Sequence, residues 1–213
     1  TVMSCDNVRE NGHVAKVAVL GLAQARDPQL AEWIAANATF PCTMVDRIVP
    51  AATPETLQEI ADQLGVYDPC AIACEPFRQW VIEDNFVNGR PDWDKVGAQF
   101  VADVVPFEMM KLRMLNGSHS FLAWLGYLAG HAHISDCMRD DVFRRAARQL
   151  MLDEQAPTLT ITGVDLLAYA DSLIARFSNP ALKHRTWQIA MDGSQKLPQR
   201  MLDGIRVHLA RAS

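Results

Sequence analysis

The stretch Phe107–His131, FEMMKLRMLNGSHSFLAWLGYLAGH, decides how the rest of the sequence is interpreted. At about 100° per residue, its apolar side chains point in every direction around a helix. A helix that is apolar on all sides is buried inside a protein. The stretch therefore predicts a core helix, with the other helical segments packed around it.

Four polar residues interrupt this core helix: Glu108, Lys111, Asn116 and His119. With Lys111 at zero, the others fall at about 60°, 140° and 80°, so all four share one face. Burying a lysine is costly unless it is paired or neutral, so the stripe indicates a lined cavity. The alternative is a helix whose polar face meets solvent, because Lys and Glu are usually surface residues. Gly117 favours the cavity, because a glycine inside a helix often marks close approach of a backbone or ligand.

Helical spacing also dominates the sequence on both sides of this stretch. The predicted helices are 14–25, 28–36, 53–64, 93–104, 141–152, 164–177 and 181–208, the last with an interruption at Pro198. Residues 78–82 have the composition of a strand, but a single strand builds no sheet. The predicted fold class is therefore all-α, with one domain from residue 1 to residue 213.

Composition narrows the class of protein. The net charge of −5 argues against a nucleic-acid partner that is held by phosphate neutralisation. The longest apolar run, Phe121–Gly130, is too short to cross a membrane, and no signal peptide is visible. The cysteines are odd in number and scattered, which favours free thiols in a cytoplasmic protein: Cys5, Cys42, Cys70, Cys74 and Cys137.

Nucleotide-binding glycines are not found in this sequence. No two glycines are spaced G-x-G, and no G-x-x-x-x-G-K-[ST] occurs. A phosphate-bearing ligand is therefore expected to be held mainly by residues outside the sequence. No metal is expected either, because Cys70-x-x-x-Cys74 and His131-x-His133 with Cys137 match no common zinc spacing.

The stretch Lys111–His119 resembles the K-x-x-x-x-N-x-x-H signature of the long-chain mannitol dehydrogenase family. Three more blocks resemble the same family in the same order, so the resemblance covers nearly the whole chain: SCDN with NG (4–12), FPCTMVDRI (40–48) and EPF with QWVIED (75–84). The run NPALKHRTWQ with DGSQK (179–196) is more similar to the fructuronate reductase branch, D-mannonate oxidoreductase, than to the mannitol branch.

The resemblance implies a two-domain dehydrogenase. The chain is expected to be its multi-helix C-terminal substrate-binding and catalytic domain, with the N-terminal nucleotide-binding domain absent and acting as its partner. NAD is expected to be bound mainly by that absent domain. The implied reaction interconverts D-mannonate and D-fructuronate. The alternatives are a polyol 2-dehydrogenase acting on mannitol or arabinitol, a tagaturonate reductase, and a non-enzymatic helical interaction domain, which the intact motif argues against.

The resemblance also assigns catalytic roles along the polar stripe. Lys111 is expected to be the general acid/base, which requires a lysine pKa well below its ordinary value of about 10.4. Asn116 is expected to donate a hydrogen bond to the oxyanion, and His119 to orient a substrate hydroxyl. Glu108 is expected to relay the proton to water, with a salt bridge to Lys111 as the alternative.

Three residues outside the stripe are implied to bind the substrate. Asn7 matches a second amide for the oxyanion, with an N-cap near Asn11 as the alternative. Asp46 matches a position that orients hydroxyls, with an ion pair to an arginine such as Arg47 as the alternative. Arg185 is the candidate for the carboxylate of a sugar acid, although an arginine near a helix start is usually solvated.

Overall fold

The computed structural model describes residues 1–212, which divide into two compact units. The first contains Thr1–Arg47 and Phe77–Glu108, and the second contains Ile48–Pro76 and the chain from Met109 onward. The all-α prediction is wrong, because the first unit is built on a β-sheet. This division into compact units does not decide whether residues 1–213 are one domain, so that expectation stays a prediction.

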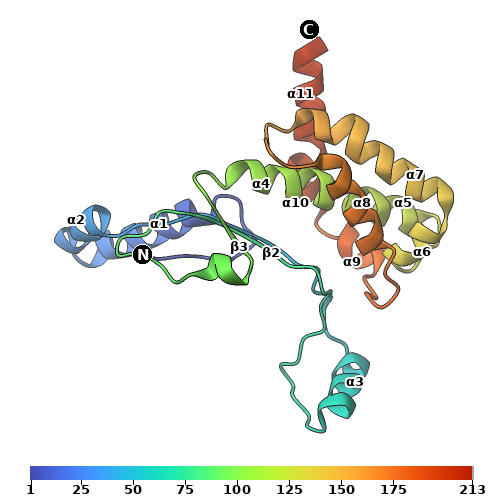
Figure 1. Ribbon diagram of the computed structural model, residues 1–213, viewed down its shortest axis with the longest axis horizontal. Coiled ribbons are helices and arrows are strands. Elements are labelled where there is room, and N and C mark those ends of the chain that lie inside the picture. The colour runs from blue at the N-terminus through green and yellow to red at the C-terminus, as the bar shows by residue number, and fades with distance from the viewer. Residues whose placement is uncertain (213) are drawn as a thin grey trace. The chain divides into compact units, whose positions relative to one another are not determined.

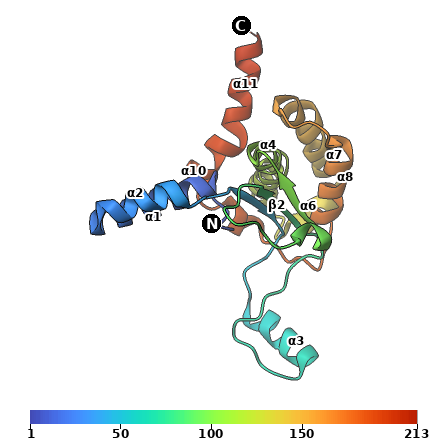
Figure 2. The ribbon, with the colours of Figure 1, turned by 60° about the vertical axis from the view of Figure 1, so that its left-hand side comes forward.

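The sheet of the first unit has three strands in the order β1-β2-β3 (Figure 2). Strand β1 (Thr43–Asp46) is antiparallel to β2 (Gln79–Glu83), and β2 is parallel to β3 (Ala98–Val101). A small apolar core lies on this sheet, formed by Cys42, Met44, Val81 and Val104 with Val101 and Phe107 against it. The sheet thereby fixes Asp46 at the end of β1.

The strand predicted at 78–82 is confirmed as β2, but its two partners were missed. The helix predicted at 93–104 is wrong: a 3₁₀ turn, η1 (Trp93–Val96), ends at Gly97 with φ of 99°, and β3 follows. Glycine adopts this left-handed conformation without strain, so the chain leaves the helical path there. Strands β1 and β3 have four residues each, too few for periodicity to reveal them.

The helices predicted at 14–25 and 28–36 are confirmed as α1 (Asn11–Arg26) and α2 (Pro28–Asn37), and the two pack against each other in the first unit (Figure 1). Asp27 separates them in an extended conformation, and its carboxylate accepts a hydrogen bond from the Gln29 amide at 2.9 Å. At the start of α1, a Cβ on Gly12 would lie 2.4 Å from the Phe40 carbonyl oxygen. The first turn of α1 therefore packs directly against the backbone of Phe40 and Pro41.

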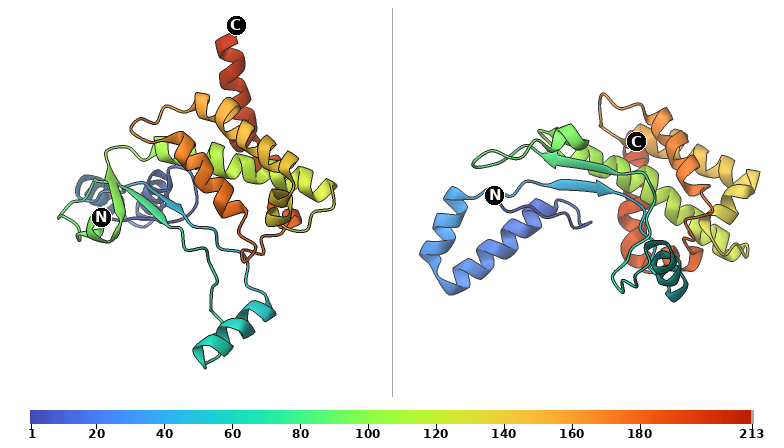
Figure 3. Two further views of the ribbon diagram at one scale, coloured as in Figure 1. Left: turned by 45° about the vertical axis from the view of Figure 1, so that its right-hand side comes forward. Right: turned by 60° about the horizontal axis from the view of Figure 1, so that its bottom comes forward.

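The second unit is helical (Figure 3). Three of its segments are π-helices, and η2 packs against both η3 and η5. The elements from residue 105 are α4 (Val105–Met110), η2 (Lys111–Gly117), α5 (Ser118–Leu128), α6 (Ile134–Arg139), α7 (Asp141–Gln149), η3 (Leu150–Gln155), η4 (Ala156–Thr158), α8 (Leu166–Phe177), α9 (Thr186–Ala190), α10 (Gly193–Leu197), η5 (Pro198–Leu202) and α11 (Asp203–Ala212).

The interruption predicted at Pro198 is wrong. The α-helix α10 ends at Leu197, but the chain does not leave the helix there: Pro198 begins the π-helix η5, and the helical run continues through it. The break lies earlier, between α9 and α10, where Asp192 has a positive φ of 58°. The chain turns at Asp192 because Asp tolerates the left-handed region better than most residues.

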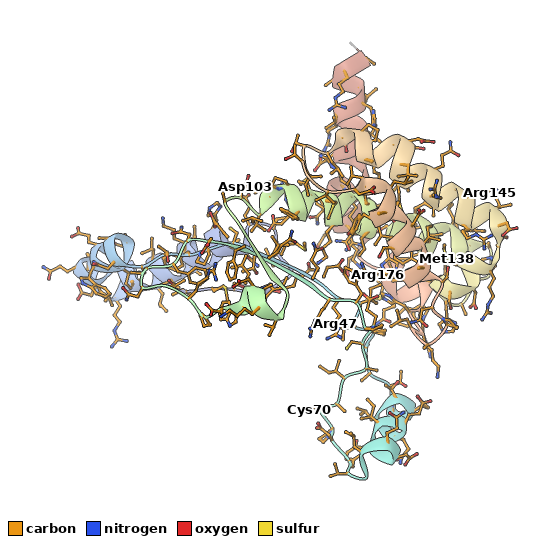
Figure 4. The ribbon with its side chains drawn as sticks, in the orientation of Figure 1. Arg47, Cys70, Asp103, Met138, Arg145 and Arg176 are labelled. Carbon is orange, nitrogen blue, oxygen red and sulfur yellow. The ribbon has the colours of Figure 1, made fainter. Side chains whose placement is uncertain are left out.

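A long excursion, residues 48–76, carries helix α3 (Pro54–Leu64) away from its own ends, and Cys70 is labelled on it (Figure 4). As predicted, Thr53 caps the first turn and Gly65 ends the helix with φ of 72°. Glu75 closes the excursion: its Oε1 accepts the Ile48 amide at 2.6 Å, and its carboxylate accepts Arg176 Nε at 3.0 Å and Nη2 at 2.7 Å. We call the contact of Glu75 with Ile48 and Arg176 the neck of the excursion.

Among the described residues, no helix combines the length and the apolar character needed to cross a bilayer. The five cysteines are free thiols, as expected. Within residues 1–212, no three His, Cys, Asp or Glu side chains gather where they could hold a metal ion.

Candidate active site

Lys111 lies inside the protein, as the apolar surroundings of its helix predicted. It is the first residue of η2 and is 9% exposed, and Met110, Met114 and Leu122 on the same run are fully buried. The alternative of a solvent-facing polar stripe is therefore wrong for Lys111 and for His119, which is 6% exposed. Asn116 is partly buried.

The π-helix changes which residues share a face. In an α-helix Lys111 and Asn116 would point about 140° apart. A π-helix bonds residue i to i+5, so each turn holds about one residue more. Residues five apart, such as Lys111 and Asn116, then stand nearly one above the other. His119 follows Asn116 by three residues, in the first turn of α5, which keeps it on the same side.

Close packing holds this π-helix in place. A Cβ on Gly117 would lie 2.3 Å from Nε2 of Gln155 on η3 and 2.9 Å from the carbonyl oxygen of Arg200 on η5. Ser118 donates its hydroxyl back to the Met114 carbonyl, which turns that group away from the helix ladder. Gly117 is thus the point where the three π-helices meet, which explains a glycine inside a helix.

The imidazole of His119 packs against two other rings. Its imidazole stacks on Phe177 with centroids 4.6 Å apart, and meets His184 edge to face at 4.8 Å and 84°. Burial, then the charges of His184, Arg200 and Arg176, hold the pKa of His119 well below its ordinary value. A neutral imidazole can both donate and accept, which suits a residue that orients a hydroxyl.

Three polar residues around this helix were not found from the sequence: His184, Gln155 and Arg200. Nδ1 of His184, Nε of Arg200 and both amide atoms of Gln155 are enclosed, with no hydrogen-bond partner among the described residues. Burial and the charge of Lys196 lower the pKa of His184. Each residue reaches the site across a long sequence separation, so no local pattern could identify it.

The first unit holds three predicted site residues. Asp46 is 2% exposed and lines a cavity of about 270 Å³ with Arg78, Gln79 and Trp80 among others. Asn7 is exposed, and the helix that starts at Asn11 has Glu10 as its N-cap residue.

Glu108 also belongs to the first unit. Its carboxylate accepts the backbone amide of Glu10 at 3.2 and 3.3 Å, just before α1 begins. An anion near a helix N-terminus is favourable, so Glu108 has a structural task as well as the predicted one.

Arg185 lies in different surroundings from His119. It is exposed, precedes α9, and forms an isolated β-bridge with His133. It lines a cavity of about 430 Å³ with Tyr127, Trp187 and other residues. Lys111, Asn116, His119 and Arg185 are residues of the second unit, whereas Asn7, Asp46 and Glu108 are residues of the first. That all seven serve one site stays a prediction.

Two family models match the chain. The mannitol dehydrogenase C-terminal domain matches residues 103–213, and the mannitol dehydrogenase Rossmann domain matches residues 1–95. The chain belongs to the mannitol dehydrogenase family. The expectation that the nucleotide-binding domain lies outside the chain is therefore wrong, since the match to its model includes the sheet strands β1 and β2.

Relatives of the mannitol dehydrogenase family align along nearly the whole chain. D-mannonate oxidoreductase of Escherichia coli (strain K12) is 82% identical over 98% of this chain and 43% of that protein. The structure of a substrate-free D-sorbitol dehydrogenase matches with a TM-score of 0.92 and 42% identity, covering 99% of this chain and 44% of that one. Mannitol 2-dehydrogenase of Pseudomonas fluorescens, in a ternary complex with NAD and D-mannitol, matches with a TM-score of 0.86 and 42% identity, covering 99% and 43%. The chain thus spans less than half the length of these relatives.

The residues that match the Rossmann model do not form a pyrophosphate cradle. Such a cradle needs open glycines at a helix N-terminus, and the sequence has no G-x-G. Gly12, at the start of α1, has its open side filled by the backbone of Phe40 and Pro41.

Proposed function

We propose that the protein containing this chain is an NAD-dependent oxidoreductase that interconverts D-mannonate and D-fructuronate. Family membership and the 82% identity to a D-mannonate oxidoreductase support this proposal. The observation that carries it is Lys111, a lysine buried at the start of a π-helix that also contains Asn116.

Lys111 Nζ acts as the general acid/base. When bound, NAD supplies or accepts the hydride at the reacting carbon. In oxidation, neutral Lys111 takes the proton of the substrate hydroxyl; in reduction, its ammonium returns that proton to the developing alkoxide. Glu108 passes the proton between Lys111 and water.

The remaining residues position the substrate. Asn116 and Asn7 donate hydrogen bonds to the oxygen where negative charge develops, which stabilises the transition state more than the ground state. Neutral His119 and Asp46 orient neighbouring hydroxyls. Arg185 is the sequence-based candidate for the carboxylate. No Lewis acid is invoked, because the lysine and the amides act on the same oxygen.

A polyol 2-dehydrogenase is the second candidate, favoured by the similarity to the D-sorbitol and D-mannitol enzymes. The charges around His119 favour a sugar acid, because Arg200 acts on its imidazole without a carboxylate partner, whereas Arg176 is paired with Glu75 and Lys196 with Asp192. A positive field stabilises a bound carboxylate and does nothing for a neutral polyol.

A substrate panel tests the proposal. The protein at its natural length, supplied with NADH, is expected to reduce D-fructuronate with a higher kcat/KM than tagaturonate or fructose. A preference for fructose would instead support the polyol enzyme. No turnover of any of the three would contradict both.

A further inference from the structure

Arg200, on η5, carries a positive charge that no acidic side chain balances. Among residues 1–212, its guanidinium has no ion-pair partner, and burial alone shifts its pKa, to below the ordinary value. A guanidinium does not lose its proton in a protein. A partly buried cation of this kind is costly unless an anion joins it.

Other basic residues of the second unit differ from Arg200 in this respect. Most pair with a carboxylate: Arg139 with Asp136, Arg144 with Asp141, Arg148 with Asp171, Arg176 with Glu75, Lys183 with Glu59, Lys196 with Asp192, and Arg206 with Asp203. Arg145, labelled in Figure 4, and Arg185 make no such pair, but both are exposed and water solvates them. Arg200 has neither a carboxylate nor full solvation.

The donors of Arg200 show what is left for a ligand. Nη1 donates to the Ser120 hydroxyl at 3.0 Å, which fixes the guanidinium beside α5. Nε is enclosed without a partner, and Nη2 makes no hydrogen bond within the described part of the chain. The group is therefore held in place while part of its hydrogen-bonding capacity remains unused.

Arg200 is also close to the candidate site. Ser120 directly follows His119, and the charge of Arg200 contributes to the low pKa of His119. Lys196 precedes Arg200 by four residues on the continuous run Gly193–Leu202, so the two cations share one side of that run. The charge of Lys196 acts on His184, the ring against His119. Lys196 lies 3.8 Å from the Asp192 carboxylate, whereas Arg200 has no such partner among the described residues, so Arg200 supplies the unbalanced positive charge near His119.

We infer that Arg200 binds the carboxylate of the substrate and makes the protein select sugar acids over neutral polyols. This inference rests on the proposed function and transfers the carboxylate role from Arg185 to Arg200. A guanidinium fixed through one nitrogen is preorganised for a carboxylate oxygen, whereas the exposed Arg185 would first have to give up water and side-chain freedom.

The test replaces each arginine by methionine, which keeps the length of the stem and removes the charge. In the natural-length protein, R200M is expected to raise KM for D-fructuronate by about 10- to 100-fold, as for loss of a charge-assisted hydrogen bond, with kcat changing less. kcat/KM for D-fructose should stay within about threefold. The matched control R145M, at an exposed arginine of α7, should leave kcat/KM for both substrates within about twofold, and R200K should recover part of the loss.

Calorimetry of D-mannonate binding separates this inference from the proposed function. Binding weakened by R200M would support the inference even if the wild type turned over no sugar acid. Equal losses for fructuronate and fructose would mean that Arg200 is structural, and the inference would fall. It would also fall if R185M, and not R200M, weakened binding.

A free inorganic anion could be held by the same guanidinium, since Arg200 and Gln155 also line a cavity of about 40 Å³, although Glu154 lines it too and would repel an anion. Thermal unfolding with chloride replaced by glutamate distinguishes this source. Chloride that stabilises the wild type, combined with no change of fructuronate KM in R200M, would overturn the inference. If R200M does not fold, R200Q, which can still reach Ser120, provides the same comparison.

Discussion

Two groups of buried polar residues, one in each unit, differ in how fully they are hydrogen-bonded. In the first unit the Asn11 amide is saturated: Nδ2 donates to the carbonyls of Asp6 and Thr43 at 2.9 and 3.0 Å, and Oδ1 accepts the Thr43 amide at 2.8 Å. In the second unit, His184, Arg200 and Gln155 keep enclosed atoms without partners. Unpaired buried groups are costly, so a protein retains them where they serve chemistry.

Trp80 is consistent with this distinction although it belongs to the first unit. Its Nε1 is enclosed without a partner, and the residue lines the same cavity as Asp46. Saturated polar groups therefore mark the supporting structure, and unsaturated ones gather near the predicted site residues in both units.

The largest effect is expected at Lys111 in the second unit. Lys111→Ala in the natural-length protein should lower kcat by about 10²- to 10⁴-fold, because it removes the proton acceptor, while KM moves much less. Lys111→Arg should not restore activity, since a guanidinium stays protonated. Steady-state kinetics measure both, and an alanine variant with most of its kcat would remove Lys111 from the mechanism.

Asn11 should give the opposite result in the first unit. Asn11→Ala leaves the Thr43 amide and two carbonyls without partners, so we expect the free energy of unfolding to fall by about 2–3 kcal/mol. kcat per folded molecule should not change, because the Asn11 side chain bonds to Asp6 and Thr43, and neither is a predicted site residue. Denaturant unfolding and active-site titration measure these separately. A loss of kcat with no loss of stability would contradict a purely structural role for Asn11.

Gly117 tests whether the three π-helices support one another. Gly117→Ala places a methyl group against Gln155 and the Arg200 carbonyl, and should lower the free energy of unfolding by about 1–3 kcal/mol. The matched control is Gly204→Ala on α11, where a Cβ meets nothing within 4 Å. That substitution should stabilise the helix by up to about 1 kcal/mol. Equal effects of the two variants would rule out a packing role for Gly117.

The smallest effect concerns pH. The folded pKa values of His119 and His184 are lowered, so the unfolded chain binds more protons as pH falls. Stability should therefore be fully present above the unfolded pKa of about 6.5 and decline below it. The variant His119→Gln should flatten this decline, whereas a change at the exposed His13 provides the control. The free energy of unfolding measured from pH 5 to pH 8 checks this. A wild-type stability that rose as the pH fell would contradict it.

Periodicity was sufficient for the parts of the fold that are locally determined. The buried helix around Lys111, helices α1 to α3 and the cap at Thr53 follow from spacing and from single residues. The strands β1 and β3 do not, because four residues carry little pattern and their pairing partners are distant in sequence. The part of the nucleotide-binding domain that the chain contains has no G-x-G glycines, so glycine spacing could not reveal it.

The π-helix at Lys111 could not be predicted from the sequence, for a different reason. Its residues have the same apolar pattern in an α-helix and in a π-helix, and the wider turn is set by packing against η3 and η5. Arg200 was missed because its contact with Ser120 spans 80 positions. What the sequence could not supply was therefore the arrangement of distant segments around a correctly predicted helix.

The neck of the excursion makes residues 49–74 an exchangeable module. Ile48 and Glu75 are bonded in both directions, Ile48 amide to Glu75 carboxylate and Glu75 amide to Ile48 carbonyl, so the ends of the insert are fixed without help from α3. For a loop with fixed ends, doubling its length costs only about 0.6 kcal/mol of closure entropy. A protein engineer can therefore graft a different binding sequence or an affinity tag between these two residues and leave the neck intact.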